Sequence, residues 1–259
     1  HRKIVVVDGK IGFTGGMNVG DEYLGLNPEI GEWRDTHLRI EGPTVWQLQQ
    51  VFAEDWYYST DEQLTDSRLF PVPHSANQGI AQVFSGGPDG VRDPFHRLYF
   101  TALNEAQESI TLATSYFAPT EPLIMALESA AGRGVRVRVM LTGKSVYPWT
   151  VWCARSFYDT LLRAGVEIFE YRKGMLHSKT LTIDGCWSLV GSTNFDYRSM
   201  LLNFEVGVAL YGEEYARALE SQFEQDRSHC RQIHLSDWEH RPLRRVFVEN
   251  CCRLFAPLV

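Results

Sequence analysis

A histidine, a lysine and an aspartate recur at the same spacing in two distant stretches of this 259-residue chain. Residues 177–184 read His-Ser-Lys-Thr-Leu-Thr-Ile-Asp, and residues 1–8 read His-Arg-Lys-Ile-Val-Val-Val-Asp. A Gly-Ser-Thr-Asn run at 191–194 likewise matches Gly-Gly-Met-Asn at 15–18. Because both the motif and the element after it agree, the chain contains an internal duplication.

The repeated residue types suit a site that handles phosphate. If residues 176–183 form a strand, His177 and Lys179 share one face, because side chains alternate along a strand. Ser192, Thr193 and Asn194 predict a tight turn whose amides and small polar side chains reach a phosphoryl oxygen. The two copies together supply His1, His177, Lys3, Lys179, Asn18 and Asn194.

This set of side chains fits phosphodiester exchange without a metal ion. One imidazole attacks phosphorus to form a phosphohistidine, while the other protonates the departing alkoxide and later deprotonates the incoming alcohol. Lysines and asparagines stabilise the charge of the transition state. The residues alone allow either histidine to be the nucleophile.

Four carboxylates are predicted to support this chemistry. Glu205 lies 28 residues after His177, and Asp35 holds the comparable place after His1, so we expect each to hold the far ring nitrogen of a histidine. Asp8 and Asp184 fall on the opposite strand face and precede a glycine. They are interpreted as turn and scaffold groups, with direct catalysis as the less favoured alternative.

The duplicated HxKxxxxD pattern resembles the signature of the phospholipase D superfamily, and within it the chain is most similar to bacterial cardiolipin synthases. The similarity covers nearly the whole chain. Besides the two motifs it includes Gly15–Asn18, Trp33–Asp35, Arg92–Pro94, Ser115–Pro119, Arg133–Val135, Ala164–Val166, Asn203–Val206 and Arg253–Leu258.

The resemblance implies a phosphatidyltransferase that joins two phosphatidylglycerol molecules into cardiolipin and glycerol, with His1 as nucleophile and His177 as acid/base. It also implies a bacterial membrane protein, anchored by N-terminal helices absent from this sequence, with its site on the cytoplasmic side. Two alternatives stay open: a hydrolytic phospholipase D or phosphodiesterase, and a catalytically silent lipid-binding scaffold.

The order of predicted elements indicates an α/β fold. From Ile80, strands and helices alternate, as in a layered sheet with crossover connections. The resemblance implies two repeats related by a pseudo-twofold, each a mixed sheet flanked by helices. About ninety residues precede His177 in its repeat and none precede His1, so we expect an incomplete first repeat with linker at 1–79 and a second repeat with a C-terminal helical segment at 80–259.

Local signals predict several element boundaries. Asp8-Gly9 is typical of a hairpin turn, and Pro43 is expected to open a helix that ends near Tyr57. Asp93 and Pro94 predict the cap and first position of another helix. One long helix is expected over residues 150–164.

Composition narrows the class of partner. A net charge of −7 argues against a nucleic-acid binder, and no run of about 20 apolar residues is present. Residues 227–259 carry six arginines and three acids, so this segment either faces anionic lipid headgroups or is a solvated helix face. Five cysteines without a CxxC pair indicate a reducing compartment, and no metal site or cofactor is predicted.

Overall fold

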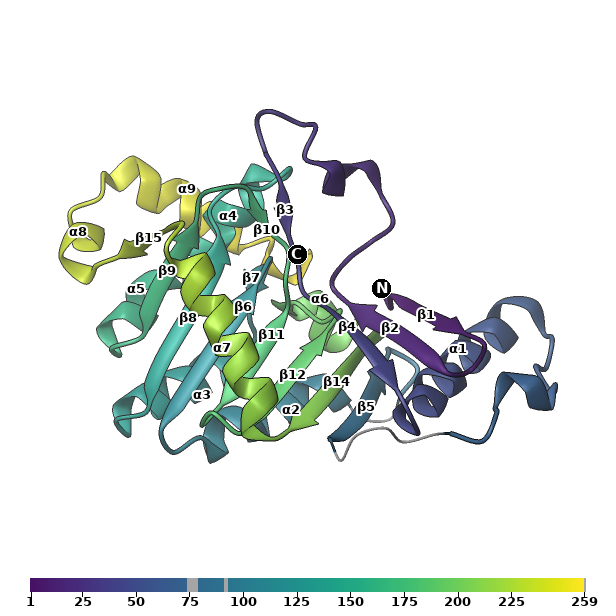
Figure 1. Cartoon of the computed structure of the whole chain (residues 1–259). Coiled ribbons are helices and arrows are strands. Elements are labelled where there is room, and N and C mark those ends of the chain that lie inside the picture. Colours follow the sequence, from purple (N-terminus) through teal and green to yellow (C-terminus); the bar gives the residue numbers. More distant parts are fainter. Residues whose placement is uncertain (74–78, 91–92, 259) are drawn as a thin grey trace.

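The computed structural model of the chain describes residues 1–73, 79–90 and 93–258. Residues 74–78 of the predicted linker and Arg92 of the shared segments lie outside this range. Within it the strands form one eight-stranded sheet, one three-stranded sheet and two short pairs (Figure 1).

The eight-stranded sheet has the order β15-β9-β8-β6-β11-β12-β14-β5. Its centre is parallel from β6 through β8 to β9, and its other pairings are antiparallel. The predicted mixed α/β sheet is therefore confirmed. Its strands are β5 (Ile80–Gly86), β6 (Ser109–Thr114), β8 (Arg136–Thr142), β9 (Glu167–Tyr171), β11 (Thr180–Ile183), β12 (Trp187–Gly191), β14 (Glu205–Tyr211) and β15 (Cys230–Ile233).

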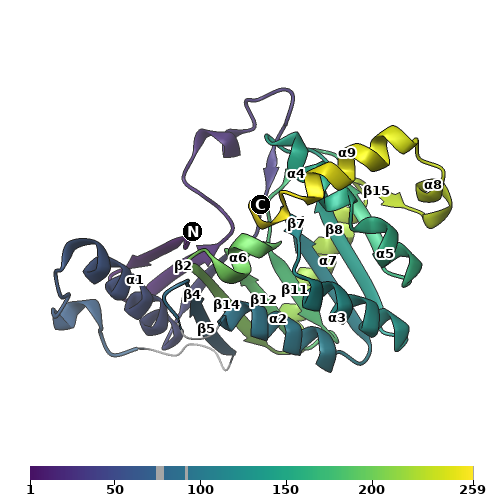
Figure 2. The same ribbon diagram turned by 180° about the vertical axis from the view of Figure 1, so that it is seen from behind.

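Helices cover both faces of this sheet. Helix α7 crosses one face, whereas α2, α3 and α5 lie on the other (Figures 1 and 2). No helix in the described ranges has the length and apolarity needed to cross a bilayer. The helices are α1 (Thr44–Thr60), α2 (Pro94–Glu105), α3 (Glu121–Gly132), α4 (Pro148–Arg155), α5 (Tyr158–Arg163), α6 (Tyr197–Leu201), α7 (Glu213–Arg227), α8 (Leu235–Glu239) and α9 (Leu243–Arg253), with short 3₁₀ segments η1 (Asp21–Leu24), η2 (Ser67–Leu69) and η3 (Ala256–Leu258).

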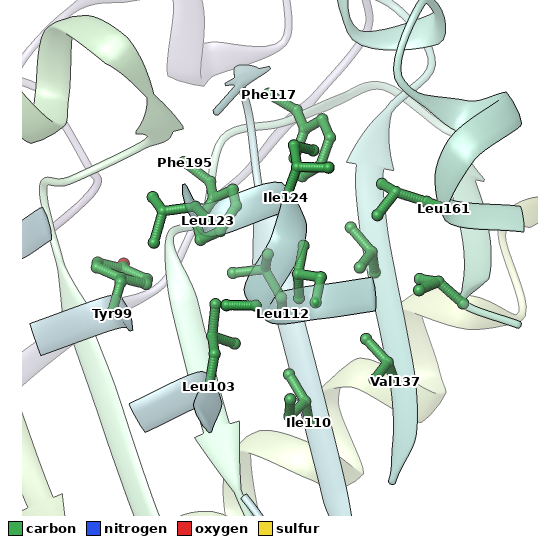
Figure 3. Packing of buried hydrophobic residues seen from close by; sticks show 14 of the residues in the cluster. Tyr99, Leu103, Ile110, Leu112, Phe117, Leu123, Ile124, Val137, Leu161 and Phe195 are labelled. Carbon is green, nitrogen blue, oxygen red and sulfur yellow. The ribbon is translucent and has the colours of Figure 1, made fainter. Parts of the chain in front are cut away.

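The main core lies between the sheet and helices α2, α3 and α5 (Figure 3). At its upper end the rings of Phe117 and Phe195 stack with centroids 5.5 Å apart. These residues come from two short strands that pair in parallel, β7 (Phe117–Ala118) and β13 (Phe195–Asp196). Phe195 directly follows Asn194, so the core fixes the end of the second motif. Burial of such a side chain stabilises the fold by about 1.5–3 kcal/mol.

The first motif belongs to the three-stranded sheet, which contains β1 (Ile4–Val7), β2 (Ile11–Gly15) and β4 (His37–Glu41). Leu38 and Ile40 of β4 pack against Val190, Val208 and Leu210 of β12 and β14. The two repeats therefore meet along an apolar seam. A further parallel pair, β3 (Trp33–Arg34) with β10 (Met175–Leu176), joins them at one end of that seam.

The duplication is visible in the two hairpins. Strands β1 and β11 each begin three residues after their histidine and pair antiparallel with the next strand. Asp8 and Gly9 turn with φ of 54° and 62°, and Asp184 and Gly185 with 50° and 60°. The hairpin predicted at Asp8-Gly9 is confirmed, and the second repeat uses the same left-handed turn.

Three local predictions need correction. The expected helix over 150–164 is two helices, because Ser156 and Phe157 donate to carbonyls three residues back and the Ser156 hydroxyl also bonds the Cys153 carbonyl. The expected strand over 176–183 begins only at Thr180. Asp93 occupies the cap position of α2, but its side chain makes no capping hydrogen bond.

The Asp184 carboxylate ties the second hairpin to the main sheet. It accepts hydrogen bonds of 2.8–2.9 Å from the backbone N–H groups of Gln107, Glu108 and Ser109, at the start of β6. These bonds lower its pKa against the opposing effect of burial. Their stabilisation is therefore present at neutral pH and is lost as pH falls through the lowered pKa.

We expect Asp184→Asn to lower the free energy of unfolding by about 2 kcal/mol, because a neutral amide accepts these bonds less well. Urea unfolding at pH 7 measures the change. Asp61→Asn is the matched control, since Asp61 is exposed and has a similar φ of 57°. Equal effects of the two substitutions would show that the three bonds contribute little.

Candidate active site

Both motif histidines lie just outside the strands that follow them. His177, Ser178 and Lys179 connect β10 to β11, and residues 1–3 precede β1. The backbone N–H of His177 donates to the Arg34 carbonyl at 2.7 Å, and the backbone nitrogen of His1 donates to the Phe204 carbonyl at 2.6 Å. Each histidine is therefore positioned by backbone of the other repeat.

The histidine–carboxylate pairs also cross the seam. Nδ1 of His1 lies 3.0 Å from both carboxylate oxygens of Glu205, and Nδ1 of His177 lies 2.7 Å from Oδ2 of Asp35. Along the chain each carboxylate follows the histidine of its own repeat, but in the structure it pairs with the histidine of the other repeat. The parallel pair β3–β10 brings Asp35 beside His177 instead.

Each carboxylate has further donors, and these differ between the repeats. Glu205 accepts from the Ser192 hydroxyl and from Nδ2 of Asn203 at 3.2 Å. Asp35 accepts from the backbone N–H of Thr36 at 2.7 Å and from the Tyr23 hydroxyl at 2.9 Å. Ser192 was predicted to contact phosphate, but its hydroxyl is directed to Glu205.

In the first repeat the Tyr23 hydroxyl donates to the carboxylate, as the Ser192 hydroxyl does in the second repeat. Gly16 occupies the position equivalent to Ser192, and a Cβ there would lie 2.2 Å from Oδ1 of Asp35. The hydroxyl therefore comes from Tyr23, whose Oη also lies 2.9 Å from Nδ1 of His177. The sequence did not predict Tyr23 because this residue lies outside the duplicated pattern. The difference between Gly16 and Ser192 in the two motifs is the one feature of the sequence that indicates a hydroxyl donor from elsewhere in the first repeat.

Lys179 is buried and Lys3 is half-buried. Nζ of Lys179 donates to Oγ of Ser115 at 2.8 Å and to the His177 carbonyl at 2.5 Å, and Nζ of Lys3 donates to the His1 carbonyl at 2.5 Å. Burial lowers the pKa of Lys179 to about 7 and that of Lys3 to about 8. An anion between them would restore both ammonium charges.

The charges of both motifs act on one another, which indicates that the two motifs lie close together. Lys3 lowers the pKa of Lys179, whereas Asp35 and Glu205 both raise it. Burial and Lys179 lower the pKa of His177 to about 4, and Lys3 adds to the effect. The side chain of His177 is 6% exposed and that of His1 is 33% exposed, so the two histidines occupy different environments.

Of the other predicted residues, the two asparagines lie after the second strand of each hairpin and the two aspartates lie in the hairpin turns. Asn194 is 4% exposed, its Oδ1 has no partner among the described residues, and it lines a cavity of about 370 Å³ beside His1. Asn18 is half-buried, three residues after the end of β2. Asp8 and Asp184 lie in the turns at the far ends of β1 and β11, where Asp184 holds backbone rather than the site.

The arrangement can bind a phosphodiester between two cations and present an oriented imidazole from each repeat. An imidazole whose Nδ1–H is held by a carboxylate has its Nε2 free to attack or to exchange a proton. No group of three or more histidine, cysteine or acidic side chains suited to a metal ion occurs within 1–73, 79–90 and 93–258.

Residues 99–227 match the family model described as "Cardiolipin synthase, PLD-like domain". A cardiolipin synthase of Geobacillus thermodenitrificans is 41% identical over 261 residues, an alignment that covers all of this chain and 52% of that protein. A probable cardiolipin synthase of Bacillus subtilis is 42% identical over 258 residues and is covered to 51%. The chain thus spans about half the length of the curated relatives it matches.

Solved structures share the fold at low sequence identity. The phosphatidylserine synthase of Haemophilus influenzae superposes with a TM-score of 0.73 at 15% identity, covering 100% of this chain and 68% of that one. The phospholipase D family member Nuc of Salmonella typhimurium superposes with a TM-score of 0.52 at 18% identity, covering 61% of this chain and 99% of that one.

The lowered lysine pKa values predict that anion binding takes up protons. We expect sulfate to bind at pH 8 with uptake of about one proton, because the anion raises the pKa of Lys179 and Lys3. Calorimetry in buffers of different ionisation enthalpy measures the uptake. Lys179→Met should lose most of it and Lys173→Met, at an exposed lysine, should keep it. A binding enthalpy independent of buffer would contradict the prediction.

Proposed function

The chain belongs to the cardiolipin synthase family of the phospholipase D superfamily, and from this premise we propose that it carries the transfer site of a phosphatidyltransferase. The proposed reaction joins two phosphatidylglycerol molecules into cardiolipin and releases glycerol. The observation that carries the proposal is the crossed arrangement, in which each repeat supplies one imidazole and the carboxylate that orients the other.

In the first step Nε2 of one histidine attacks the phosphorus of the donor lipid. The bond from phosphorus to the glycerol oxygen breaks, and the second imidazolium gives its proton to the departing alkoxide. Lys3 and Lys179 stabilise the charge on the non-bridging oxygens, and Asn18 and Asn194 add donors. The products of this step are glycerol and a phosphatidyl-histidine.

In the second step a hydroxyl of the acceptor lipid attacks the same phosphorus. Its proton passes to the second imidazole, and the phosphorus–nitrogen bond breaks. Water must be kept from this intermediate. The ring of Trp33, with its centroid 5.0 Å from that of His177, and the ring of Tyr23 cover one side of the site.

The superfamily pattern gives the nucleophilic attack to His1 and the proton transfers to His177. Without a bound ligand, a pKa of about 4 keeps His177 neutral at pH 7. A bound phosphodiester anion must therefore raise this pKa before His177 can act as an acid. The near symmetry of the site leaves the reverse assignment chemically open.

The proposed setting is the surface of a bacterial membrane. Family membership supports phospholipid substrates. Anchoring through N-terminal helices outside this sequence, and a site on the cytoplasmic side, are parts of the same proposal. Exposed Tyr147, which lines the cavity beside His1, suits the headgroup layer of a bilayer.

An activated substrate separates the roles of the histidines. We expect His177→Ala to release one equivalent of nitrophenolate from p-nitrophenyl phosphatidyl ester and to accumulate labelled protein, because nitrophenolate leaves without an acid. His1→Ala should give no burst, and His234→Ala, at an exposed histidine, should turn over normally. The reverse pattern would make His177 the nucleophile. A wild-type protein that never carries label would contradict the covalent route.

Removal of the Tyr23 hydroxyl tests the asymmetric support of His177. We expect Tyr23→Phe to lower kcat about tenfold. The Tyr23 hydroxyl is a hydrogen-bonding partner of both Asp35 and His177, and a hydrogen bond to the charged Asp35 carboxylate is stronger than one between neutral groups. The pH dependence of kcat should shift as well, because the Tyr23 hydroxyl lies against Nδ1 of His177 and its loss changes the pKa of that imidazole. Tyr57→Phe changes an exposed tyrosine and is the control. An unchanged pH profile would show that Tyr23 does not position the pair.

A further inference from the structure

The cavity beside His1 has a polar floor. Asn194 lines it, and its buried Oδ1 has no hydrogen-bond partner within the described residues; Asp196, 1% exposed, also lines the cavity. One oxygen of Asp196 accepts from the backbone N–H of Ser199 at 2.7 Å, at the start of α6. Asn203 lines the cavity too, and its Nδ2 donates to Oε1 of Glu205. Amides and a carboxyl group offer several donors and acceptors to a polyol.

Arg198 stands at the edge of this cavity as an exposed cation. Its backbone is fixed, because its carbonyl accepts from the N–H groups of Leu202 and Asn203 at 2.8 Å. Its guanidinium makes no hydrogen bond or ion pair within the described part of the chain. By contrast, Arg34 and Arg155 are each held by a carboxylate. A guanidinium of this kind is suited to a phosphate group.

The charge of Asp196 does not oppose such a ligand strongly. Burial raises its pKa to about 7, and part of its remaining charge is compensated by the Ser199 N–H. The outer rim of the cavity is aromatic and apolar. Tyr147 and Leu258 line it and are 57% and 64% exposed, and Trp149 lines the cavity as well. Such a rim suits the acyl side of a lipid.

We infer that this cavity is the subsite for the acceptor lipid: it holds the glycerol headgroup of a second phosphatidylglycerol, and Arg198 binds that lipid's own phosphate. The inference rests on the proposed function. The donor phosphate occupies Lys3 and Lys179 in the seam, so the acceptor phosphate needs a separate cation. His1 and Asn194 belong to both the cavity and the seam, which places the acceptor hydroxyl beside the phosphorus under attack.

The step assigned to the subsite conserves atoms and charge. The hydroxyl oxygen of the bound glycerol forms the new bond to phosphorus, and the phosphorus–nitrogen bond of the phosphatidyl-histidine breaks. The hydroxyl proton passes to the histidine that does not carry the phosphatidyl group. A small neutral alcohol such as ethanol can perform the same step without contacting Arg198.

Competition between the two acceptors tests the inference. The full-length protein is given vesicles of labelled phosphatidylglycerol with ethanol, and cardiolipin and phosphatidylethanol are measured together. We expect Arg198→Gln to lower the ratio of cardiolipin to phosphatidylethanol at least about tenfold, the effect of losing a charge-assisted contact. The rate of phosphatidylethanol formation should stay within about twofold, because the donor step does not use Arg198. Arg198→Lys, which keeps the charge but loses the planar fork, should give an intermediate ratio.

Arg217→Gln is the matched control, because Arg217 is exposed on α7 across the main sheet, and its ratio should equal that of the unchanged protein. An unchanged ratio in Arg198→Gln would overturn the acceptor subsite and leave the proposed transferase intact. An equal loss of both products would also overturn it, since Arg198 would then serve the donor step or the fold. If the unchanged protein forms neither product, the proposed function itself fails.

Discussion

The exchange of hydrogen bonds across the seam is the constraint on which the rest of the structure depends. His1 is held by Glu205 and His177 by Asp35, and the backbone nitrogen of each histidine donates to the carbonyl just before the carboxylate. Neither repeat can orient its own imidazole. A buried charge without its partner is costly, so the site requires that the two repeats meet in one register.

The surrounding fold supplies that register. The apolar contacts of β4 with β12 and β14 join the repeats along their length. The short pair β3–β10 aligns Asp35 with His177 at one end. On the other side of the main sheet, the stacked rings of Phe117 and Phe195 hold the turn that carries Asn194. Burial of Lys179 is tolerated here because carboxylates of both repeats, Asp35 and Glu205, act on its charge.

The repeated motif in the sequence predicted the duplication and which residues to examine as a site. Asp8-Gly9 predicted the first hairpin, and the alternation of strands and helices from Ile80 predicted the α/β class. The sequence did not predict which carboxylate serves which histidine, because strand pairing between the repeats, not distance along the chain, decides that. It also missed Tyr23, which lies outside the duplicated pattern and is needed because Gly16 replaces a serine. The split between α4 and α5 depends on local hydrogen bonds at Ser156, which periodicity does not reveal.

Nitrogen-15 NMR of the histidine rings tests the crossed pairing most directly, because ring-nitrogen shifts report hydrogen bonding at Nδ1. With both ring signals assigned, the account predicts that Glu205→Gln changes the Nδ1 signal of His1 and leaves that of His177 in place. It predicts the opposite for Asp35→Asn. A Glu205→Gln variant that moves the His177 signal and leaves His1 unchanged would contradict it.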